Sequence, residues 1–143
     1  MTITLHKETD ETRVNDVTPS EDADFQFELP ANFTGNICIE GTITGNSIKC
    51  LFSLPDGASG KATMTLIKDN STNSIRIFGR KIDLTDAAAI NAAWPVCFFR
   101  LSGYIKTGEN GGTCKFLWSQ NTASSTATVL EAGATMTIIG ETL

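Results

Sequence analysis

The chain has 143 residues and a mass of 15.3 kDa, which suits one domain with a hydrophobic core of its own. Hydrophobic residues make up 41% and charged residues 19% of the sequence, a balance that excludes a wholly disordered chain. No apolar run approaches the roughly 20 residues that a membrane-spanning helix needs, and the first residues lack the apolar centre of a signal peptide. We therefore expect a soluble protein with no membrane partner that reaches its destination without cleavage.

The charge is concentrated near the N-terminus. The formal net charge is −5, and residues 1–30 hold two basic against eight acidic side chains, so the rest of the chain is almost neutral. Neither part has the basic stripe that neutralises the phosphates of a nucleic acid. We therefore expect no nucleic-acid partner, and an acidic segment that either stays solvated or binds a basic protein surface.

Residues 1–24 contain few large apolar side chains and are predicted to form an extended acidic N-terminal arm. At about 3.3 Å per residue, such an arm spans roughly 80 Å and would reach a neighbouring subunit. From Phe25 to Pro30 apolar and polar residues alternate with the period of a half-buried strand. The predicted boundary therefore separates the arm from one β-domain at residues 25–143.

Residues 36–54 are predicted to form a β-hairpin. The pair Gly45-Asn46 is typical of a two-residue type II′ turn, which would pair Thr44 with Ser47. In that register the apolar side chains of both strands share one face, as in an antiparallel sheet that covers a core.

The next segments continue the pattern of short strands. Strands are predicted at residues 62–67 and 74–82, on either side of a polar turn. Residues 83–94 form either a short helix or an ordered loop, because the alanine-rich run is too short to be stable alone as a helix. Two final strands are predicted at residues 126–130 and 136–139.

A second hairpin is predicted over residues 96–120, with a glycine-rich loop at 107–112 and Lys106 paired with Thr113. In total about eight short strands, separated by turns, favour an all-β antiparallel fold, either a β-sandwich or a jelly roll, over βαβ units.

Four cysteines are predicted to be buried thiols that act as small hydrophobes, as in a protein assembled in a reducing cytoplasm. The predicted registers place the sequence-adjacent pairs, Cys38 with Cys50 and Cys97 with Cys114, too far apart for disulfides. Cross-sheet pairs of Cys50 with Cys97 or Cys114 remain open. The spacings contain no C-x-x-C, so no structural zinc site is expected.

Catalytic motifs are lacking in the sequence. His6 is the only histidine and lies in the arm, away from any nucleophile motif, so no catalytic triad is expected. The carboxylates of the domain are scattered, and no glycine-rich phosphate-binding motif occurs. Trp94 and Trp118 have side chains that stack on sugars, although Trp118 continues an apolar row and is predicted to pack in the core. We therefore predict no enzymatic activity, no cofactor and no metal site.

The C-terminal third resembles a known family. The segments G-Y-I at 103–105, W-S-Q-N-T at 118–122 and V-L-E-A-G-A-T-M at 129–136 resemble the ending of tumour-necrosis-factor-like jelly rolls found among tailed-bacteriophage virion proteins. Ala134 stands where that family ordinarily has serine, a small change that keeps the turn plausible. The resemblance spans residues 103–139 and implies a TNF-like jelly roll that assembles as a homotrimer.

The resemblance implies a structural role in a virion. The leading hypothesis is a capsid decoration (cement) protein of a bacteriophage, made in the host cytoplasm and bound through the major capsid protein to the capsid surface. Strand 96–106 carries apolar side chains on its otherwise polar row, which suits a subunit interface. The candidate trimer-interface residues are Val96, Phe98 and Tyr104, and the candidate capsid-binding residues of the arm are Glu8, Asp10, Glu11, Arg13 and Asp16.

The alternative hypothesis is a receptor- or glycan-binding head domain of a phage tail or head fibre. Such heads usually follow a fibrous stalk, whereas a short acidic arm precedes this domain. That difference favours the decoration role.

Overall fold

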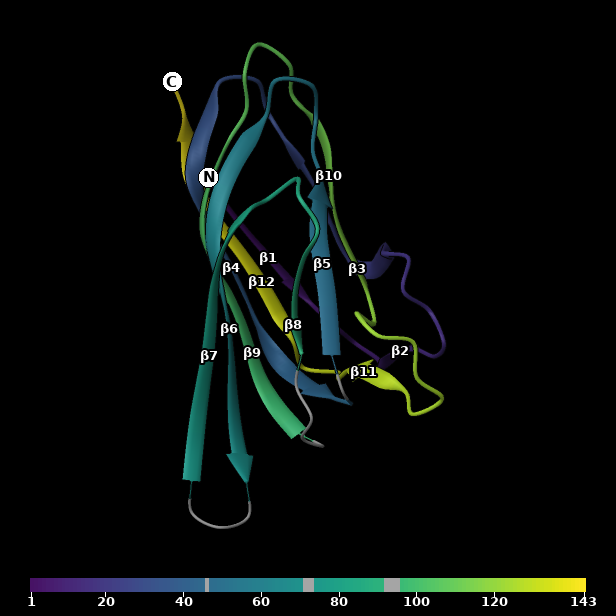
Figure 1. The fold of residues 1–143 in the computed structure, drawn as a ribbon. Helices are drawn as coiled ribbons and strands as arrows, with labels where there is room; N and C mark the ends of the chain where they lie inside the picture. Colours follow the sequence, from purple (N-terminus) through teal and green to yellow (C-terminus); the bar gives the residue numbers. More distant parts are fainter. Residues whose placement is uncertain (46, 71–73, 92–95) are drawn as a thin grey trace.

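The computed structural model describes the chain except for residues 46, 71–73 and 92–95 (Figure 1). The described residues form twelve strands and no helix, so none of them belongs to a helix that would span a membrane. In chain order the strands are β1 (Thr2–His6), β2 (Glu11–Arg13), β3 (Ser20–Leu29), β4 (Phe33–Thr44), β5 (Ser47–Ser53), β6 (Ser59–Asn70), β7 (Ser74–Asp83), β8 (Ala88–Asn91), β9 (Val96–Lys106), β10 (Gly112–Ser119), β11 (Thr128–Leu130) and β12 (Thr135–Thr142).

These strands form two antiparallel sheets that enclose one core (Figure 1). The large sheet has the order β1-β12-β4-β9-β6-β7, and β11 joins it beside β4 with β2 beside β11. The small sheet has the order β3-β10-β5-β8. The predicted all-β antiparallel sandwich is confirmed.

Strand pairing is nested along the chain. Strand β1 pairs with β12, β3 with β10, β4 with β9 and β5 with β8. This nesting describes one long hairpin wound around a core, the arrangement of a jelly roll, in which successive strands mostly change sheet. Strand β2 pairs with β11 in the same scheme, and the hairpin of β6 and β7 is the innermost of the nested pairs.

The predicted hairpin at residues 36–54 is wrong, although both of its strands exist. Thr44 pairs with Val96 and Ser47 pairs with Asn91, so β4 and β5 lie in different sheets. Alternation fixes which face of a strand is buried but not which strand lies beside it. Gly45 has a φ of 111°, and a Cβ there would lie 2.6 Å from the carbonyl oxygen of Ala127, so its chain bend is packed closely against the segment before β11.

The predicted hairpin at residues 96–120 is wrong for the same reason. Lys106 pairs with Thr34 and with Ser59 in the large sheet, while Thr113 pairs with Glu28 in the small sheet. The connection between β9 and β10 therefore crosses from one sheet to the other.

Other predicted strands are confirmed. Strand β7 pairs with β6 over its whole length, and both strands are longer than predicted. Residues 71–73 of the predicted polar turn lie outside the described residues. Strands β11 and β12 match the predicted final strands. The short-helix alternative for residues 83–94 is wrong where the chain is described, because Ala88–Asn91 forms β8 beside β5. Pairing with β5 stabilises a segment too short to be a stable helix.

The core lies between the sheets and is rich in aromatic rings. The Phe116 ring centroid lies 5.3 Å from that of Phe52 and 6.3 Å from that of Phe25. Trp118 is fully buried, as predicted, whereas Trp94 lies outside the described residues. Cys50 and Cys114 are buried thiols, in keeping with the prediction, and Cys38 is a partly exposed thiol.

Much of the N-terminal segment runs along the edge of the large sheet. Thr2–His6 pairs with β12 as strand β1, and Glu11–Arg13 pairs with β11 as strand β2. Ile3 and Leu5 pack against the core, and the backbone of Lys7 exchanges hydrogen bonds with Gly133 and Ala134. The alternation at Ile3 and Leu5 is too short to distinguish such an edge strand from an extended tail.

Candidate functional site

Two features of the molecule depart from the usual partition of polar and apolar side chains. One is the outer face of the large sheet, formed by side chains of β12, β4, β9, β6 and β7 that point away from the core. The other is a buried charge cluster formed by Lys7, Glu11, Arg13, Asp22 and Asp24 against Trp118.

The outer face carries an apolar row near one end of the sheet. Phe98 lies opposite Thr42 on one side and Ile67 on the other, and Ile67 lies opposite Ile77. Residues directly opposite each other in an antiparallel pair share a face, so Phe98, Ile67 and Ile77 form an apolar row across β9, β6 and β7, with Thr42 of β4 at its end. Phe98 is 43% exposed and Ile77 is 69% exposed, which leaves large apolar surface in water.

A second apolar patch lies farther along β9. Tyr104 and Ile139 both lie opposite Asn36, and they are 44% and 55% exposed. A shallow hollow beside them is lined by residues of β4, β9 and β12. Six positions along a strand separate Phe98 from Tyr104, a distance of roughly 20 Å.

A polar band separates the two apolar areas. Arg100 forms an ion pair with Glu40 at 3.2 Å between Nε and Oε1, and Cys38 lies opposite Ser102. The outer face therefore alternates apolar, charged and apolar along the strands, a pattern that suits contact with another protein surface.

The structure places two of the three predicted trimer-interface residues on this face, one in each of its two apolar areas. Phe98 and Tyr104 are exposed on β9. The backbone of Val96 pairs with Thr44 at the start of the same strand, and its side chain lies outside the described residues.

The predicted arm residues have different surroundings. Glu8 and Asp10 are exposed, and the Asp10 carboxylate accepts a hydrogen bond from the Ala132 backbone N–H at 2.8 Å. Asp16 accepts a hydrogen bond from the Thr18 backbone N–H. Glu11 and Arg13 instead take part in the buried charge cluster.

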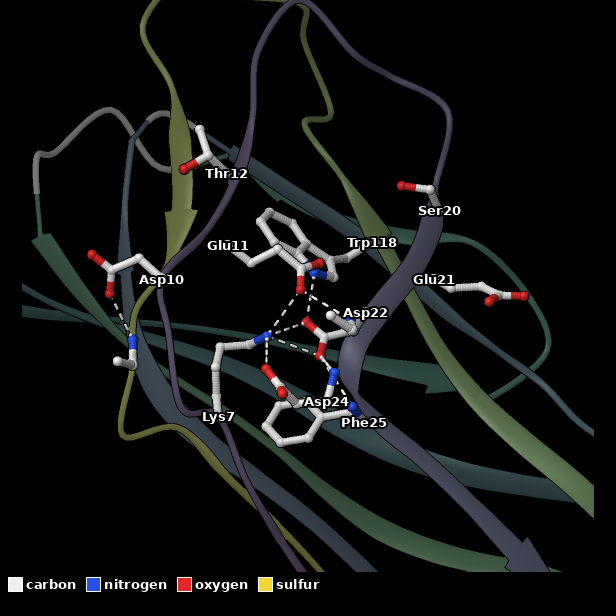
Figure 2. A network of polar contacts seen from close by, with 12 residues as sticks. Lys7, Asp10, Glu11, Thr12, Ser20, Glu21, Asp22, Asp24, Phe25 and Trp118 are labelled. Carbon is white, nitrogen blue, oxygen red and sulfur yellow. Dashed lines mark hydrogen bonds and ion pairs between the residues drawn. The ribbon is translucent and has the colours of Figure 1, made fainter.

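Lys7 is the centre of the buried charge cluster (Figure 2). Its side chain has no exposed surface, and its Nζ lies 2.8 Å from Oδ2 of Asp22, 3.0 Å from Oδ2 of Asp24 and 3.1 Å from Oε1 of Glu11. The ligand oxygens of these three carboxylates lie within 4.8 Å of one another, the spacing of a cation site, and the Lys7 ammonium supplies positive charge there.

Asp22 is held by more donors than Lys7 alone. Its Oδ1 accepts hydrogen bonds from the backbone N–H groups of Asp24 and Phe25, at 2.9 and 3.1 Å, and its Oδ2 accepts one from the Trp118 indole at 3.0 Å (Figure 2). A fully buried carboxylate needs such partners, because an unpaired charge is costly to remove from water.

Glu11 and Arg13 form the outer part of the cluster. Glu11 accepts a hydrogen bond from the Ala23 backbone N–H at 2.9 Å and one from Arg13 Nη2 at 2.7 Å. The Arg13 guanidinium lies 4.2 Å from the centre of the Trp118 ring and donates to the Trp118 carbonyl oxygen. Arg13 therefore covers both the carboxylate and the indole.

The cluster shifts the pKa of two of its members. Burial lowers the pKa of Lys7, but its hydrogen bonds to Asp22 and Asp24 outweigh burial and raise the pKa above its ordinary value. Burial raises the pKa of Glu11, but hydrogen bonds from Ala23, Arg13 and Lys7 lower it overall. Both groups are therefore held in their charged forms.

Comparisons with known proteins do not show which family this chain belongs to. No family model and no curated protein matches it. A chain of the human norovirus GI.7 Houston strain virus-like particle is 13% identical, with 90% of this chain and 31% of that chain covered at a TM-score of 0.31. A chain of infectious bursal disease virus, Gt strain, is 11% identical, with 99% of this chain and 41% of that chain covered at a TM-score of 0.20. The chain spans less than half of either, and TM-scores this low carry no argument about its function.

Proposed function

We propose that the chain is a structural virion protein that assembles as a homotrimer and decorates the outer surface of a phage head. The observation that carries this proposal is the outer face of the large sheet, where the aromatic side chains of Phe98 and Tyr104 are exposed to solvent. The nested jelly roll and the resemblance of residues 103–139 to TNF-like phage virion proteins support the virion class.

The proposed trimer contact covers both apolar areas of the outer face. Burying an exposed aromatic ring removes apolar surface from water at roughly 25 cal/mol per Å². The Glu40–Arg100 band between the areas fixes the register of a partner by charge. A second copy of the same chain is the proposed occupant, in keeping with the homotrimers of the resembling family.

Light scattering tests this assembly. The purified chain is expected to have a solution mass near three protomers, and Tyr104→Asp is expected to reduce it to one because a carboxylate would be buried unpaired. Ser53→Asp is the matched control, since Ser53 is exposed on the small sheet opposite Lys115. A monomeric wild-type chain would overturn the proposal, and so would a Tyr104→Asp variant that stays trimeric.

The proposed contact with the major capsid protein uses the exposed acids near the N-terminus. Glu8 is the cleanest probe, because Glu11 and Arg13 are committed to the buried charge cluster. Glu8→Lys is expected to weaken cosedimentation with purified phage heads more strongly at low salt than at high salt. Glu109→Lys makes the same charge change at an exposed loop and is expected to bind normally. Equal binding of both variants would exclude Glu8 from the contact.

A glycan-binding head is the second candidate, favoured by one observation. Tyr104 stands beside the hollow that Asn36 and Glu141 also line, an aromatic ring next to amide and carboxylate groups. Sugars are bound by such combinations. Binding to a glycan array that is lost in Tyr104→Ala, together with no binding to phage heads, would favour this candidate over the decoration role.

A further inference from the structure

The buried charge cluster holds the Lys7 ammonium against both oxygens of the Asp22 carboxylate. Nζ of Lys7 lies 2.8 Å from Oδ2 and 2.9 Å from Oδ1 of the same Asp22 carboxylate. Two distances this short place Nζ about 3 Å from Cγ, the separation of reacting atoms before attack. Both side chains are fully buried, so the pair is fixed and shielded from water.

We propose that Lys7 and Asp22 form an intramolecular isopeptide bond without any external enzyme. A proton moves from the Lys7 ammonium to Glu11, whose Oε1 lies 3.1 Å from Nζ. The freed amine attacks Cγ of Asp22, the C–N bond forms, and the Cγ–Oδ2 bond breaks. Oδ2 leaves as water with two of the three ammonium protons, one of them returned by Glu11. The product is a neutral amide plus one water molecule, and Glu11 is again a carboxylate.

The surroundings of Asp22 suit this condensation. Oδ1 is held by the backbone N–H groups of Asp24 and Phe25, which would stabilise the negative charge that develops on it during attack. Oδ1 is therefore assigned as the oxygen that remains in the amide. The Phe25 ring lies 5.3 Å from Nζ and contributes to the dry surroundings of the pair.

Before the reaction Lys7 and Asp22 form an ion pair, and this charged state limits the rate of bond formation. The hydrogen bonds of Lys7 favour its ammonium form, so attack proceeds through the minor neutral form. We expect the link to form slowly after folding. Once formed, it joins the end of β1 in the large sheet to β3 in the small sheet, and it replaces an ion pair by a bond that denaturants do not break.

Mass spectrometry of the folded chain tests the proposal independently of any virion role. After prolonged incubation, the wild-type chain is expected to be lighter than its sequence mass by one water, whereas Lys7→Arg keeps a cation and retains its full mass. Trypsin does not cut after an acylated lysine, so residues 1–13 are expected to emerge joined to residues 14–49. Release of a free peptide 8–13 from incubated wild-type protein at full mass would overturn the proposal.

Two further variants test the mechanism. Asp22→Asn is expected to give the same final product mass as the wild type, because the same amide forms with loss of ammonia in place of water. Glu11→Gln is expected to slow the loss of water at least tenfold while the linked product stays the same. Formation of a linked product at an unchanged rate in Glu11→Gln would overturn the assigned role of Glu11, and a different linked residue in the peptide map would overturn the pairing.

Discussion

The buried charge cluster and the outer face of the large sheet differ in whether their side chains find partners within the described part of one chain. The cluster hides five charged side chains beside a tryptophan, and the structure supplies partners for each of them. The outer face leaves a phenylalanine and a tyrosine in water, and the described part of one chain supplies nothing to cover them. The cluster is therefore complete within one chain, whereas the outer face would be covered only in the assembly that we propose. Four experiments test this contrast, taken from the largest expected effect to the smallest.

Lys7→Met is expected to lower the free energy of unfolding by about 3–5 kcal/mol, because it leaves buried carboxylates without their cation. Chemical denaturation measures the loss. Lys61→Met is the control, since Lys61 forms an exposed ion pair with Asp83 at 3.8 Å and is expected to cost less than about 0.5 kcal/mol. Equal losses of unfolding free energy in Lys7→Met and Lys61→Met would show that burial of the cluster does not contribute to stability.

Gly103→Ala tests how closely the strands beneath the outer face approach one another. A Cβ at Gly103 would meet the carbonyl oxygen of Lys61 on β6, and relief requires the two strands to separate. The expected loss of stability is about 1–3 kcal/mol, measured by thermal unfolding. Gly79→Ala on β7 is the control, because a Cβ there meets no atom within 4 Å. A stable Gly103→Ala variant would contradict the close pairing of β6 with β9.

Acid is expected to weaken the charge cluster. The pKa of Glu11 is lower in the folded chain than its ordinary value of 4.5, so its contribution to stability is present above that value and is lost as the pH falls through the folded pKa. Unfolding midpoints measured from pH 6 to pH 2 are expected to fall less steeply in Glu11→Gln than in the wild type. Parallel curves for the two proteins would contradict the shift.

Thiol labelling distinguishes the outer face from the core, first in the wild-type chain and then in a variant of the outer face. Cys38 is partly exposed on the outer face, whereas burial raises the pKa of Cys50 and Cys114 to about 12. At neutral pH a thiol reagent is expected to modify Cys38 in the folded chain, and Cys50 and Cys114 only after unfolding. Cys38 is also expected to react faster in Tyr104→Asp than in the wild type, because dissociation uncovers the face. Equal rates would show that Cys38 lies outside the contact.

The sequence predicted the strands better than their partners. Alternation at Phe25, Phe27 and Leu29 depends on one strand and one buried face, and β3 buries all three side chains. The partner of a strand depends on how the chain turns between sheets, and the Gly45 bend gives the same local signal for a hairpin as for a crossing. Local patterns therefore predicted the sandwich but not its pairing.

The two features differ in how far the sequence revealed them. Phe98 and Tyr104 stood out because they interrupt the polar row of β9. Lys7, Asp22 and Trp118 come together from positions up to 111 residues apart, which no spacing rule predicts. The one available signal was that Lys7 and Arg13 are the only cations in a strongly acidic segment, and both are found paired with its acids.

The nested pairing has a consequence for how the chain folds. Strand β1 can pair with β12 only after the chain has been made as far as Ile139, because Thr2 lies opposite Ile139. Contacts this distant in sequence are slow to form, so the closing step is expected to come late in folding. Before β1 pairs, the backbone N–H and C=O groups on that edge of β12 are unpaired. Strand β1 of a second copy can pair with this edge as well as β1 of the same chain. We therefore expect exchange of β1 between chains to be a misfolding route for this chain, and to become more frequent as the concentration of newly made chains rises.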